Sequence, residues 1–580
     1  MALEKLRVAG YDGGVPLRLA KLCMILVVLL VSPRVLFATG GTCPSGANYL
    51  SLSNPTGPRV ALSSFGVTSC YYIAANGSDS NNGTSESTPW LHSPGMPNCL
   101  ASCASVTPAS GEGFIFRGGD TWHFGNSSAS PYTGGGFMEY AWNGTASNYI
   151  YFGVDPSWYS GVSWARPIFT ADNPTSTSAV ASCTYSIAAG PLQYAQAQTL
   201  VLLAGTYEIF DNFELTGLCW STNAFGTYLY FSAATGHTNV AYVENNYVHG
   251  WTHTAAGGQA GGTGIADQQQ NDGETIRFNV IDGSDSDPLS LRAWGIGSGG
   301  RDLEYNVTTN LGGSSILDQC KNIHDNLFQY QNQLNDGSGH SDVLFCLGEA
   351  SDGASSPNIF YNNRFRLVGS PGNGYAGYVF VPGQGSDYEF NNVYDNNNAS
   401  YGNYLVTCDQ GTCGAKVMWN NTGEANLPGV SGLWSIGATT ITAVNNHWIT
   451  SDPSAFSVPS EVTETAPVYQ TLSTANSQGY SAANDFTPIS SSAATVTANG
   501  TNETTGYCAD SVLHNAAAEA ACKQGITGVS YNQANHTVVY PAFAPTPRPA
   551  TGAWNVGAYQ FGGSNSNTVN QPTNLTATVQ

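Results

Sequence analysis

The stretches IFYNNRFRL (359–367) and YEFNNVYDN (388–396) share one pattern, in which an Asn lies between bulky apolar residues. Six similar stretches occur between residues 242 and 449, and consecutive members are 20 to 37 residues apart. Because each unit contains short strands without a helical pattern, the repeat predicts a solenoid whose coils bury their apolar faces by stacking. The eight equivalent positions are Asn246, Asn279, Asn306, Asn326, Asn363, Asn392, Asn421 and Asn446.

The repeated Asn predicts a ladder inside the solenoid. A buried side-chain amide is satisfied when it bonds the equivalent amide one coil away. The residue two places after each Asn should then point inward, and this column is mostly apolar. It reads Val248, Ile281, Thr308, Phe328, Phe365, Tyr394, Gly423 and Trp448.

Composition favours an all-β protein with extensive burial. Charged residues are only 10% of the chain, whereas hydrophobic residues are 41% and aromatic residues 11%. Gly is frequent and helix-forming residues are scarce. A chain of 580 residues exceeds an ordinary single core, but a solenoid core grows along one axis, so one long domain is possible.

The charge balance disfavours nucleic-acid partners. Seventeen basic and thirty-nine acidic residues give a net charge of −22, and binding to nucleic acid or to anionic membranes needs clustered Lys and Arg. The acidity either aids solubility or supplies carboxylates for Ca²⁺ and neutral sugars. We expect a monomer.

The N-terminus predicts export. A basic stretch precedes the apolar run 22–31, and small residues follow near Ala38; this run is too short to span a bilayer comfortably. We expect a cleaved signal peptide over 1–38, a secreted or cell-surface protein, and no membrane span after cleavage. The remaining chain divides into an N-terminal extension (39–70), the repeat region (71–450), an irregular cover with a short helix at 509–523 and a closing strand (451–561), and a flexible tail (562–580).

The cysteines predict disulfides rather than a zinc site. Twelve cysteines remain after the leader, an even number in an exported protein. Their spacings do not place two ligand pairs close together, as zinc would need. Proximity in the sequence suggests Cys43 with Cys70, Cys99 with Cys103, Cys183 with Cys219, Cys320 with Cys346, Cys408 with Cys413, and Cys508 with Cys522.

Two further stretches carry a family resemblance. YYIAANGSDSNNGTSESTPW (71–90) opens with a short strand and a polar turn, and RPATGAWNVGAYQF (548–561) lies near the other end. With FIFRGGDTWHF (114–124) and the Asn repeat, they resemble the right-handed parallel β-helix proteins of the pectin lyase-like superfamily. The resemblance implies an all-β, right-handed parallel β-helix solenoid with capped ends over about residues 71–561. This superfamily contains lyases, hydrolases, epimerases, adhesins and tailspikes, so the resemblance leaves the activity open.

The motifs of two well-known activities are absent. The chain lacks the Asn-Thr-Asp, Gly-His-Gly and Arg-Ile-Lys set of polygalacturonases and the Arg-x-Pro-x-x-Arg motif of pectate lyases. It also has no P-loop and no dinucleotide-binding Gly motif. These activities are disfavoured.

A second set of strand-like runs lies between the Asn positions and predicts a substrate face. Its polar members would lie in successive coils, where carboxylates act as acid and base and Arg292 abstracts a proton or neutralises a uronate. The alternative is a solvated or structural role. The candidate catalytic residues are Arg292, Asp318, His340 and Asp342, and the candidate substrate-binding residues are Asp267, Trp294, Tyr375 and Tyr378.

The outward column three places after each Asn offers another pairing. It places His249 beside Asp282, and Arg366 beside Asp395 and then Glu424. Two neighbouring carboxylates could serve a retaining glycosidase. The favoured interpretation is an exposed ion-pair ladder, which contributes under about 1 kcal/mol.

One turn is a candidate for Ca²⁺, the only cofactor that the sequence suggests. Asp282, Asp285 and Asp287 bring oxygen ligands close together in NVIDGSDSDP. The alternative is an ordinary turn, since Asp and Ser side chains readily bond their own backbone.

Two functions remain open. The first is an exported carbohydrate-active β-helix protein that binds and cleaves an extracellular polysaccharide as a lyase or a glycosidase. The second is a non-catalytic cell-surface or adhesive protein whose coils form a rigid rod. Release of products from glycans distinguishes the two.

Overall fold

The computed structural model describes residues 40–125, 138–185, 198–220, 226–231, 240–254, 262–267, 273–286, 293–298, 302–312, 316–317, 321–331, 343–345, 358–368, 379–380, 387–395, 406–407, 415–424, 434–435, 440–450 and 457–562. Every described residue belongs to one compact unit, Ala38–Gln580.

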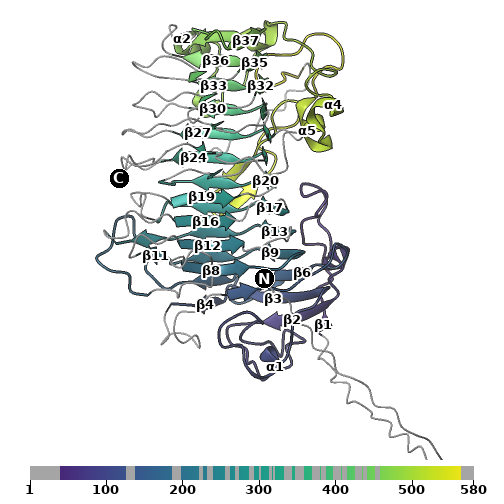
Figure 1. Cartoon of the computed structure of the whole chain (residues 1–580), viewed down its shortest axis with the longest axis vertical. Coiled ribbons are helices and arrows are strands. Elements are labelled where there is room, and N and C mark those ends of the chain that lie inside the picture. Colours follow the sequence, from purple (N-terminus) through teal and green to yellow (C-terminus); the bar gives the residue numbers. More distant parts are fainter. Residues whose placement is uncertain are drawn as a thin grey trace, which may run out of the picture. The chain divides into compact units, whose positions relative to one another are not determined.

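Three mainly parallel sheets form the body of this unit (Figure 1). The chain visits them in turn: β6, β7 and β8, then β9, β10 and β12, and so on along the sequence. Apart from β1, which pairs antiparallel with β2, each strand of these sheets pairs in parallel with its counterparts in the neighbouring coils, as β13 does with β9 and β17. The chain is therefore a stack of three-stranded coils, and the predicted all-β fold with parallel sheets is confirmed. The right-handed sense and the superfamily stay predictions.

The first sheet contains β1 (Gly41–Thr42), β2 (Ser69–Ile73), β3 (Glu112–Gly118), β6 (Ile150–Tyr159), β9 (Glu208–Asp211), β13 (Ala241–Glu244), β17 (Glu274–Arg277), β20 (Asp302–Glu304), β23 (Asn322–His324), β26 (Asn358–Tyr361), β29 (Asp387–Phe390), β32 (Lys416–Trp419), β35 (Ile441–Val444) and β37 (Val462–Thr465). The second contains β4 (Thr121–His123), β7 (Ile168–Thr170), β10 (Glu214–Thr216), β14 (Tyr247–His249), β18 (Val280–Asp282), β21 (Val307–Thr309), β24 (Leu327–Gln331), β27 (Arg364–Val368), β30 (Val393–Asp395), β33 (Thr422–Glu424), β36 (His447–Thr450) and β38 (Val468–Thr471). The third contains β5 (Met138–Tyr140), β8 (Gln198–Leu203), β12 (Gly226–Phe231), β16 (Gly262–Asp267), β19 (Ala293–Ser298), β22 (Ile316–Leu317), β25 (Leu344–Phe345), β28 (Val379–Phe380), β31 (Val406–Thr407) and β34 (Trp434–Ser435).

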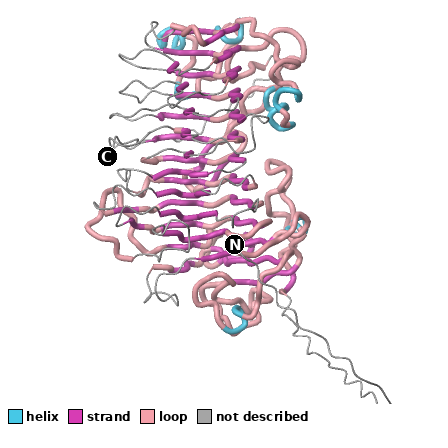
Figure 2. The backbone as a smooth tube through the Cα atoms, viewed as in Figure 1, coloured by secondary structure: helices cyan, strands magenta, loops and turns pink. Residues whose placement is uncertain are grey.

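The remaining described elements are short. Figure 2 shows strands through the stack, and the short helices of the described residues lie near its ends and along one side. Two small sheets pair β11 (Cys219–Trp220) with β15 (Thr252–His253), and β39 (Ser530–Asn532) with β40 (Thr537–Val539). The helices are η1 (Leu62–Phe65), α1 (Ala101–Ala104), α2 (Leu472–Ser477), η4 (Ala482–Asn484), α3 (Ala494–Thr497), α4 (Asp510–Leu513) and α5 (Ala516–Cys522).

The predicted Asn ladder is confirmed at all eight positions. The backbone N–H and the Nδ2 of Asn246 both donate to Oδ1 of Asn279, each at 3.0 Å. Nδ2 of Asn279 also donates to the carbonyl of Val243 in the preceding coil at 2.9 Å. The same bonds join every consecutive pair as far as Asn421 and Asn446. The buried amides therefore satisfy one another from coil to coil.

A tight corner precedes each ladder Asn and connects the first sheet to the second. The corner residue has a positive φ in every coil, such as 59° at Asn245 and 56° at Asn362. Asn and Asp tolerate this left-handed conformation better than other residues with side chains. This requirement explains why Asn or Asp occupies most of the corners.

The apolar interior lies between the three sheets. The predicted inward column contributes to it: Val248, Ile281, Phe328, Phe365, Tyr394 and Trp448 are buried there. The prediction from the repeat is therefore confirmed for these residues.

The segment after the predicted end of the repeat adds one more coil before it covers the others. β37 and β38 pair in parallel with β35 and β36, so the sheets extend past residue 450. The helix predicted over 509–523 is divided into α4 and α5, because His514 between them has a φ of 48°. Residues 472–562 then pack along the corners, where Thr527 Oγ1 donates to Asp325 and Arg364 pairs with Asp485.

Four predicted disulfides are present: Cys43–Cys70, Cys99–Cys103, Cys183–Cys219 and Cys508–Cys522. The other two predicted pairs, Cys320–Cys346 and Cys408–Cys413, lie outside the described residues. No helix in the described ranges has both the length and the apolar character needed to span a bilayer.

Candidate functional site

Most of the predicted substrate face lies outside the described residues. This applies to Arg292, Asp318, His340, Asp342, Tyr375 and Tyr378. Asp267 and Trp294 lie on the adjacent strands β16 and β19 of the third sheet, where Trp294 pairs with Thr263 and Asp267 pairs with Ser298. Asp267 and Trp294 therefore lie at opposite ends of the two strands, four residues apart in register. Their assignment as one site stays a prediction.

The predicted calcium turn is occupied by protein hydrogen bonds. Asp285 bonds His249 Nδ1 at 2.7 Å and accepts from the Gly250 N–H at 3.1 Å. Asp282 accepts from the Tyr531 hydroxyl at 2.7 Å. Asp287 lies outside the described residues. Within the described ranges, no group of three or more His, Cys, Asp or Glu side chains could hold a metal ion, and Ca²⁺ stays a prediction.

The outward column on the second sheet has the predicted register but not the predicted role. His249 pairs with Asp282 across neighbouring strands, as Asp395 does with Glu424. Arg366, however, lies 3.0 Å from Asp485 of the covering segment.

The prediction that Arg366 neutralises Asp395 is therefore wrong. Asp395 and Glu424 are each only 1% exposed. They form neither an exposed ladder nor a carboxylate pair open to substrate, because a covering segment from far along the chain lies over this face.

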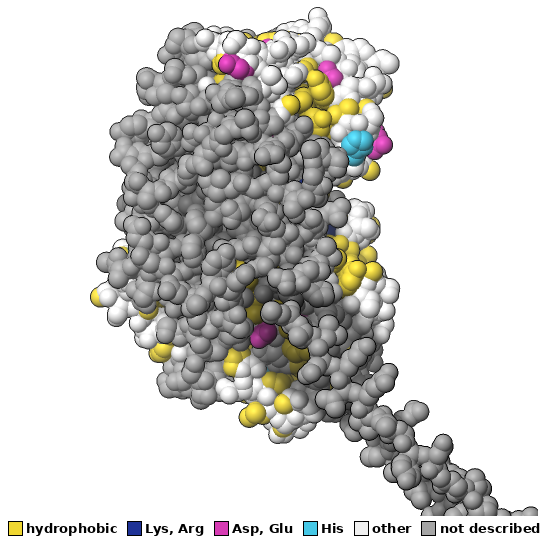
Figure 3. All heavy atoms as spheres, in the orientation of Figure 1, with side chains coloured by type: hydrophobic (Ala, Val, Ile, Leu, Met, Phe, Trp, Pro, Cys, Tyr) yellow, Lys and Arg dark blue, Asp and Glu magenta, His cyan; other side chains and the backbone are white. Residues whose placement is uncertain are grey.

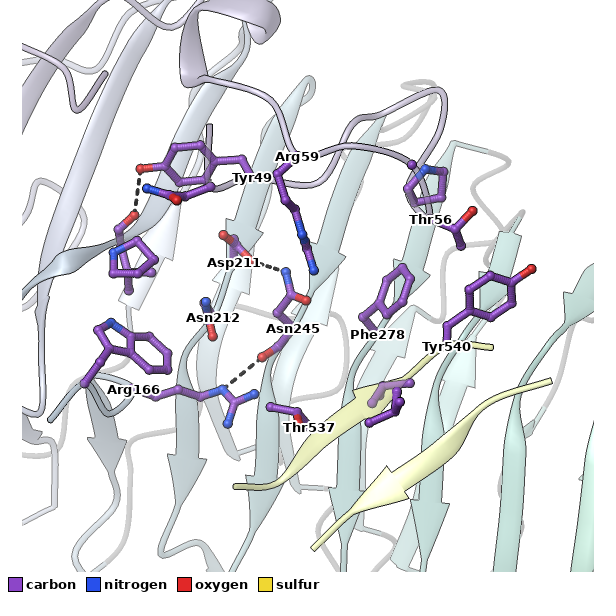
Figure 4. Close-up of a pocket in the computed structure, with 18 residues that line it drawn as sticks. Tyr49, Thr56, Arg59, Arg166, Asp211, Asn212, Asn245, Phe278, Thr537 and Tyr540 are labelled. Atoms are coloured by element: carbon purple, nitrogen blue, oxygen red, sulfur yellow. Dashed lines mark hydrogen bonds between the residues drawn. The ribbon is translucent and has the colours of Figure 1, made fainter. Parts of the chain in front are cut away.

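A pocket of about 600 Å³ lies over the corners between the first and second sheets (Figure 4). Three segments that are distant in sequence form it: an N-terminal segment, the early coils, and the hairpin β39–β40 with its flank. Its lining residues are Asn48, Tyr49, Pro55, Thr56, Gly57, Arg59, Val154, Pro156, Trp164, Arg166, Asp211, Asn212, Asn245, Phe278, Thr537, Val538, Val539 and Tyr540.

The N-terminal wall is held to the coils by several bonds. Tyr49 and Val60 exchange backbone hydrogen bonds of 3.1 and 2.9 Å, which close the loop that carries Arg59. The Tyr49 hydroxyl donates to the carbonyl of Val154 at 3.1 Å. Arg277 of β17 donates to the carbonyl of Ser51 at 3.3 Å. This wall is therefore fixed to the coil surface at more than one point.

The hairpin forms the opposite wall and is anchored on the second sheet. Tyr531 bonds Asp282, and the ring of His536 stacks on Tyr247 with centroids 4.1 Å apart. The Arg364 guanidinium also donates to the carbonyl of Val529. The chain therefore positions residues 537–540 through contacts that lie beside the pocket.

Asp211 forms part of the pocket floor, and its two oxygens already have partners. Tyr151 donates its hydroxyl to Oδ2 at 2.8 Å, and Asn245 Nδ2 donates to Oδ1 at 2.6 Å. Burial raises the pKa of the Asp211 carboxyl, against the opposing effects of these hydrogen bonds and of Arg59 and Arg166. Asp211 therefore orients the Asn245 amide at the pocket.

Two guanidinium groups face this floor. Arg166 is 7% exposed, and its Nε donates to the carbonyl of Asn245 at 3.0 Å. Arg59 is exposed and reaches from the N-terminal wall; Figure 4 shows Arg59 and Arg166 approaching Asn245 from opposite sides. The pocket thus carries more positive charge than the chain average, which is strongly acidic.

Aromatic rings complete the lining: Tyr49, Trp164, Phe278 and Tyr540. Phe278 is a corner residue with a φ of 55°, where most other coils have Asn or Asp. A bulky side chain in this conformation is strained, and Tyr305 at the next corner shares it with a φ of 58°. Flat apolar rings together with side-chain amides suit the faces and hydroxyls of sugars.

A second polar cluster lies next to the hairpin. His249 bonds Asp285 on one side and Glu214 on the other, where Nε2 and Oε1 are 3.1 Å apart. Its ring also stacks on Tyr247 with centroids 4.2 Å apart. The two carboxylates raise the pKa of His249 to about 9 against the effect of burial, so the imidazole is cationic at neutral pH. Both ring nitrogens have partners, so this His orders the surface rather than accepting a proton from a ligand.

The sequence predicted neither the pocket nor its principal residues. Arg59 and Arg166 belong to no repeated pattern, and the walls are separated by hundreds of residues. One signal was present: FDNFEL (210–215) has the spacing of one more repeat before Asn246, with Phe213 at the ladder position. Phe213 donates its backbone N–H to Asn246 Oδ1 at 2.9 Å. Extension of the repeat by one unit would have placed Asp211 and Asn212 at a corner.

Comparison with known proteins gives weak matches of backbone shape. No family model and no curated protein matches the chain. A GH136 lacto-N-biosidase from Eubacterium ramulus is 13% identical, with coverage of 70% of this chain and 68% of that one and a TM-score of 0.37. A rhamnogalacturonan lyase is 11% identical, with coverage of 69% and 87% and a TM-score of 0.30. An alginate lyase from Paenibacillus is 13% identical, with coverage of 64% and 95% and a TM-score of 0.29. At this level of similarity, the substrates of these proteins do not transfer to the chain.

Proposed function

We propose that this protein binds an extracellular polysaccharide, and that the pocket over the corners holds one of its sugar residues. The observation that carries the proposal is the lining, in which aromatic rings, side-chain amides and two guanidinium groups surround about 600 Å³. Ligand pockets combine apolar walls with a few placed polar groups in this way. The rings would cover a sugar face, and the amides of Asn212 and Asn245 would bond its hydroxyls.

We further propose that the protein cleaves the bound polysaccharide on the third-sheet face. Arg292, Asp318, His340 and Asp342 are the catalytic candidates, with Asp267, Trp294, Tyr375 and Tyr378 as substrate contacts. Arg292 would abstract a proton or neutralise a uronate, and the acids would transfer protons. Ca²⁺ at Asp282, Asp285 and Asp287 would require the first two side chains to exchange their protein partners for the ion.

The proposed location is outside the cell or on its surface. Four disulfides in the described residues indicate an oxidising compartment. The apolar run at 22–31 supports export through a cleaved leader.

The alternative is a non-catalytic surface protein. One observation favours it: four carboxylates of the second sheet and its turns are either bonded, as Asp282 and Asp285 are, or buried, as Asp395 and Glu424 are. None of these four is ready to act as an acid or base toward a polymer.

A glycan panel tests both functions. The chain without residues 1–38 is incubated with neutral and acidic polysaccharides, and reducing ends and unsaturated products are measured, with and without chelator. We expect time-dependent product that Arg292→Ala and Asp318→Ala abolish, while the exposed control Asp510→Ala keeps wild-type rates. Binding without product in every sample would contradict cleavage and favour the surface protein. Loss of binding in a folded Tyr540→Ala variant would support the pocket.

A further inference from the structure

We infer that the pocket selects a sugar residue carrying an oxyanion, either a carboxylate or a sulfate, and that Arg166 is its main recognition group. The inference rests on the proposed saccharide site and adds the charge of its ligand. Three observations support it: the hydrogen-bond partners of Arg166, the position of Arg59 at the pocket, and the hydrogen bonds that both oxygens of Asp211 already accept.

Arg166 is a buried cation without a salt bridge among the described residues. Its guanidinium donates to two backbone carbonyls, those of Asn245 at 3.0 Å and Asn535 at 3.4 Å. Asp211 and Glu214 influence it electrostatically without lying in ion-pair contact. Buried charges in proteins are normally paired, because removing an ion from water is unfavourable. An anion entering the pocket would supply the missing partner.

Asp211, the carboxylate that lines the pocket, is not available as an ion-pair partner for Arg166. Both oxygens of Asp211 accept hydrogen bonds, from Tyr151 and from Asn245. Asn245 also presents its carbonyl to Arg166, so Asp211, Asn245 and Arg166 form one connected network. This network fixes the guanidinium at the pocket and leaves part of its five-donor fork for a ligand.

Arg59 provides a second positive charge from the other side. It lines the pocket, is exposed, and extends from the N-terminal wall toward Asn245 (Figure 4). Such charge is scarce elsewhere, since the chain has 17 basic residues and a net charge of −22. On the face shown in Figure 3, Lys and Arg contribute little of the described surface. An anionic sugar would therefore be attracted to this pocket and repelled from most of the remaining surface.

The test compares matched sugars by calorimetry at low ionic strength. Glucose, glucuronate and glucose 6-sulfate share one ring and differ at the sixth carbon. We expect wild-type protein to bind at least one of the two anionic sugars at least tenfold more tightly than glucose, and comparison of the two anions identifies whether carboxylate or sulfate is preferred. Equal affinity for glucose and both anions would overturn the inference while leaving the saccharide pocket intact. Binding of no sugar would overturn the saccharide pocket and this inference together.

Substitutions of Arg166 test whether this residue causes the preference for the anionic sugar. Arg166→Gln should remove the preference for the anion, measured as the ratio of the affinities of the same variant for the anionic sugar and for glucose, whereas Arg166→Lys should keep part of this preference because it keeps the charge. Arg59→Gln is the matched control: its effect should be smaller and should disappear at high salt, because exposed charges are screened. If Arg166→Gln does not fold, the wild-type comparison and the Arg166→Lys variant still decide the result. An undiminished preference in folded Arg166→Gln would overturn the role of Arg166.

Discussion

Arg277 and Glu244 form a buried ion pair across one coil, with Nε of the guanidinium 2.8 Å from the carboxylate. The same guanidinium donates to the backbone carbonyls of Ser51 and Leu52 at 3.3 Å. One buried cation therefore joins two strands of the first sheet and the N-terminal wall of the pocket.

Removing this cation should loosen both the coil and the wall. Arg277→Met leaves the Glu244 carboxylate buried without its partner, and breaking such a pair costs about 3–5 kcal/mol. We expect a lower denaturation midpoint and faster proteolysis near Ser51. Glu244→Gln in the Arg277→Met background removes the orphaned charge, so the double variant should recover much of the stability. A double variant as unstable as the single one would contradict this account.

The Asn ladder gives a second prediction with its own pH dependence. Asn326 Nδ2 donates to the carbonyl of Leu303 at 2.8 Å and to Asn363 Oδ1 at 3.0 Å. Asn326→Asp keeps the shape but replaces this donor with a charged acceptor, and a buried unsatisfied polar group costs about 1–3 kcal/mol or more when charged.

Protonation of the new Asp would restore a donor. The loss of stability relative to wild-type protein should therefore be smaller at pH about 4 than at pH about 7, which urea denaturation at both values measures. A loss that does not depend on pH would mean that the side chain finds other partners.

The sequence predicted the parts of the fold that repeat. The ladder, the inward column and the four observed disulfides follow from periodic or local patterns, and each is present. The partner of Arg366 could not be predicted from the repeat, because Asp485 lies 119 residues further along the chain, outside any periodic relation. The pocket could not be predicted from the sequence for the same reason, since Arg59, Arg166 and Tyr540 come together only when both ends of the chain fold over the coils.

His249 should make stability fall in mildly alkaline solution. Its pKa in the folded protein is raised to about 9 from 6.5, because Asp285 and Glu214 stabilise the cation. The stabilisation is therefore complete below pH 6.5 and is lost as the pH rises to about 9, with a size on the order of 3 kcal/mol.

His324 contributes in an overlapping window, since Glu304 and Asp325 raise its pKa to about 10. Unfolding free energy measured from pH 6.5 to 10 should decline in wild-type protein, and His249→Gln should flatten the part below pH 9. An unchanged slope in His249→Gln would contradict this assignment.

Replacement of the buried Glu424 with a neutral residue should stabilise the protein. Burial and the neighbouring Asp395 raise the pKa of the Glu424 carboxyl to about 7 from 4.5. The folded state thus prefers the protonated form, and the group destabilises the protein increasingly as the pH rises from 4.5 to 7. Glu424→Gln should raise the unfolding free energy above pH 7 by on the order of 3 kcal/mol and have little effect near pH 4. A variant that is less stable than wild-type protein at pH 8 would show that the ionised carboxylate has a favourable partner.

The disulfide Cys43–Cys70 connects stability to ligand binding. It closes a loop of 27 residues that contains the whole N-terminal wall, including Tyr49 and Arg59. Replacing both cysteines with Ala should cost about 3 kcal/mol, because the unfolded chain regains the freedom that the loop removed. Cys508–Cys522 closes a loop of 14 residues that contains none of the residues lining the pocket, and it serves as the matched control.

Both double variants should be less stable, but only the first should weaken sugar binding in the pocket, because only the first frees a wall of it. Calorimetric titration below the unfolding temperature of each variant measures this difference. If both variants bind sugar as wild-type protein does, the Arg277 and Tyr49 contacts are sufficient to hold the wall without the disulfide. If both variants lose binding equally, the ligand does not bind between the N-terminal wall and the hairpin.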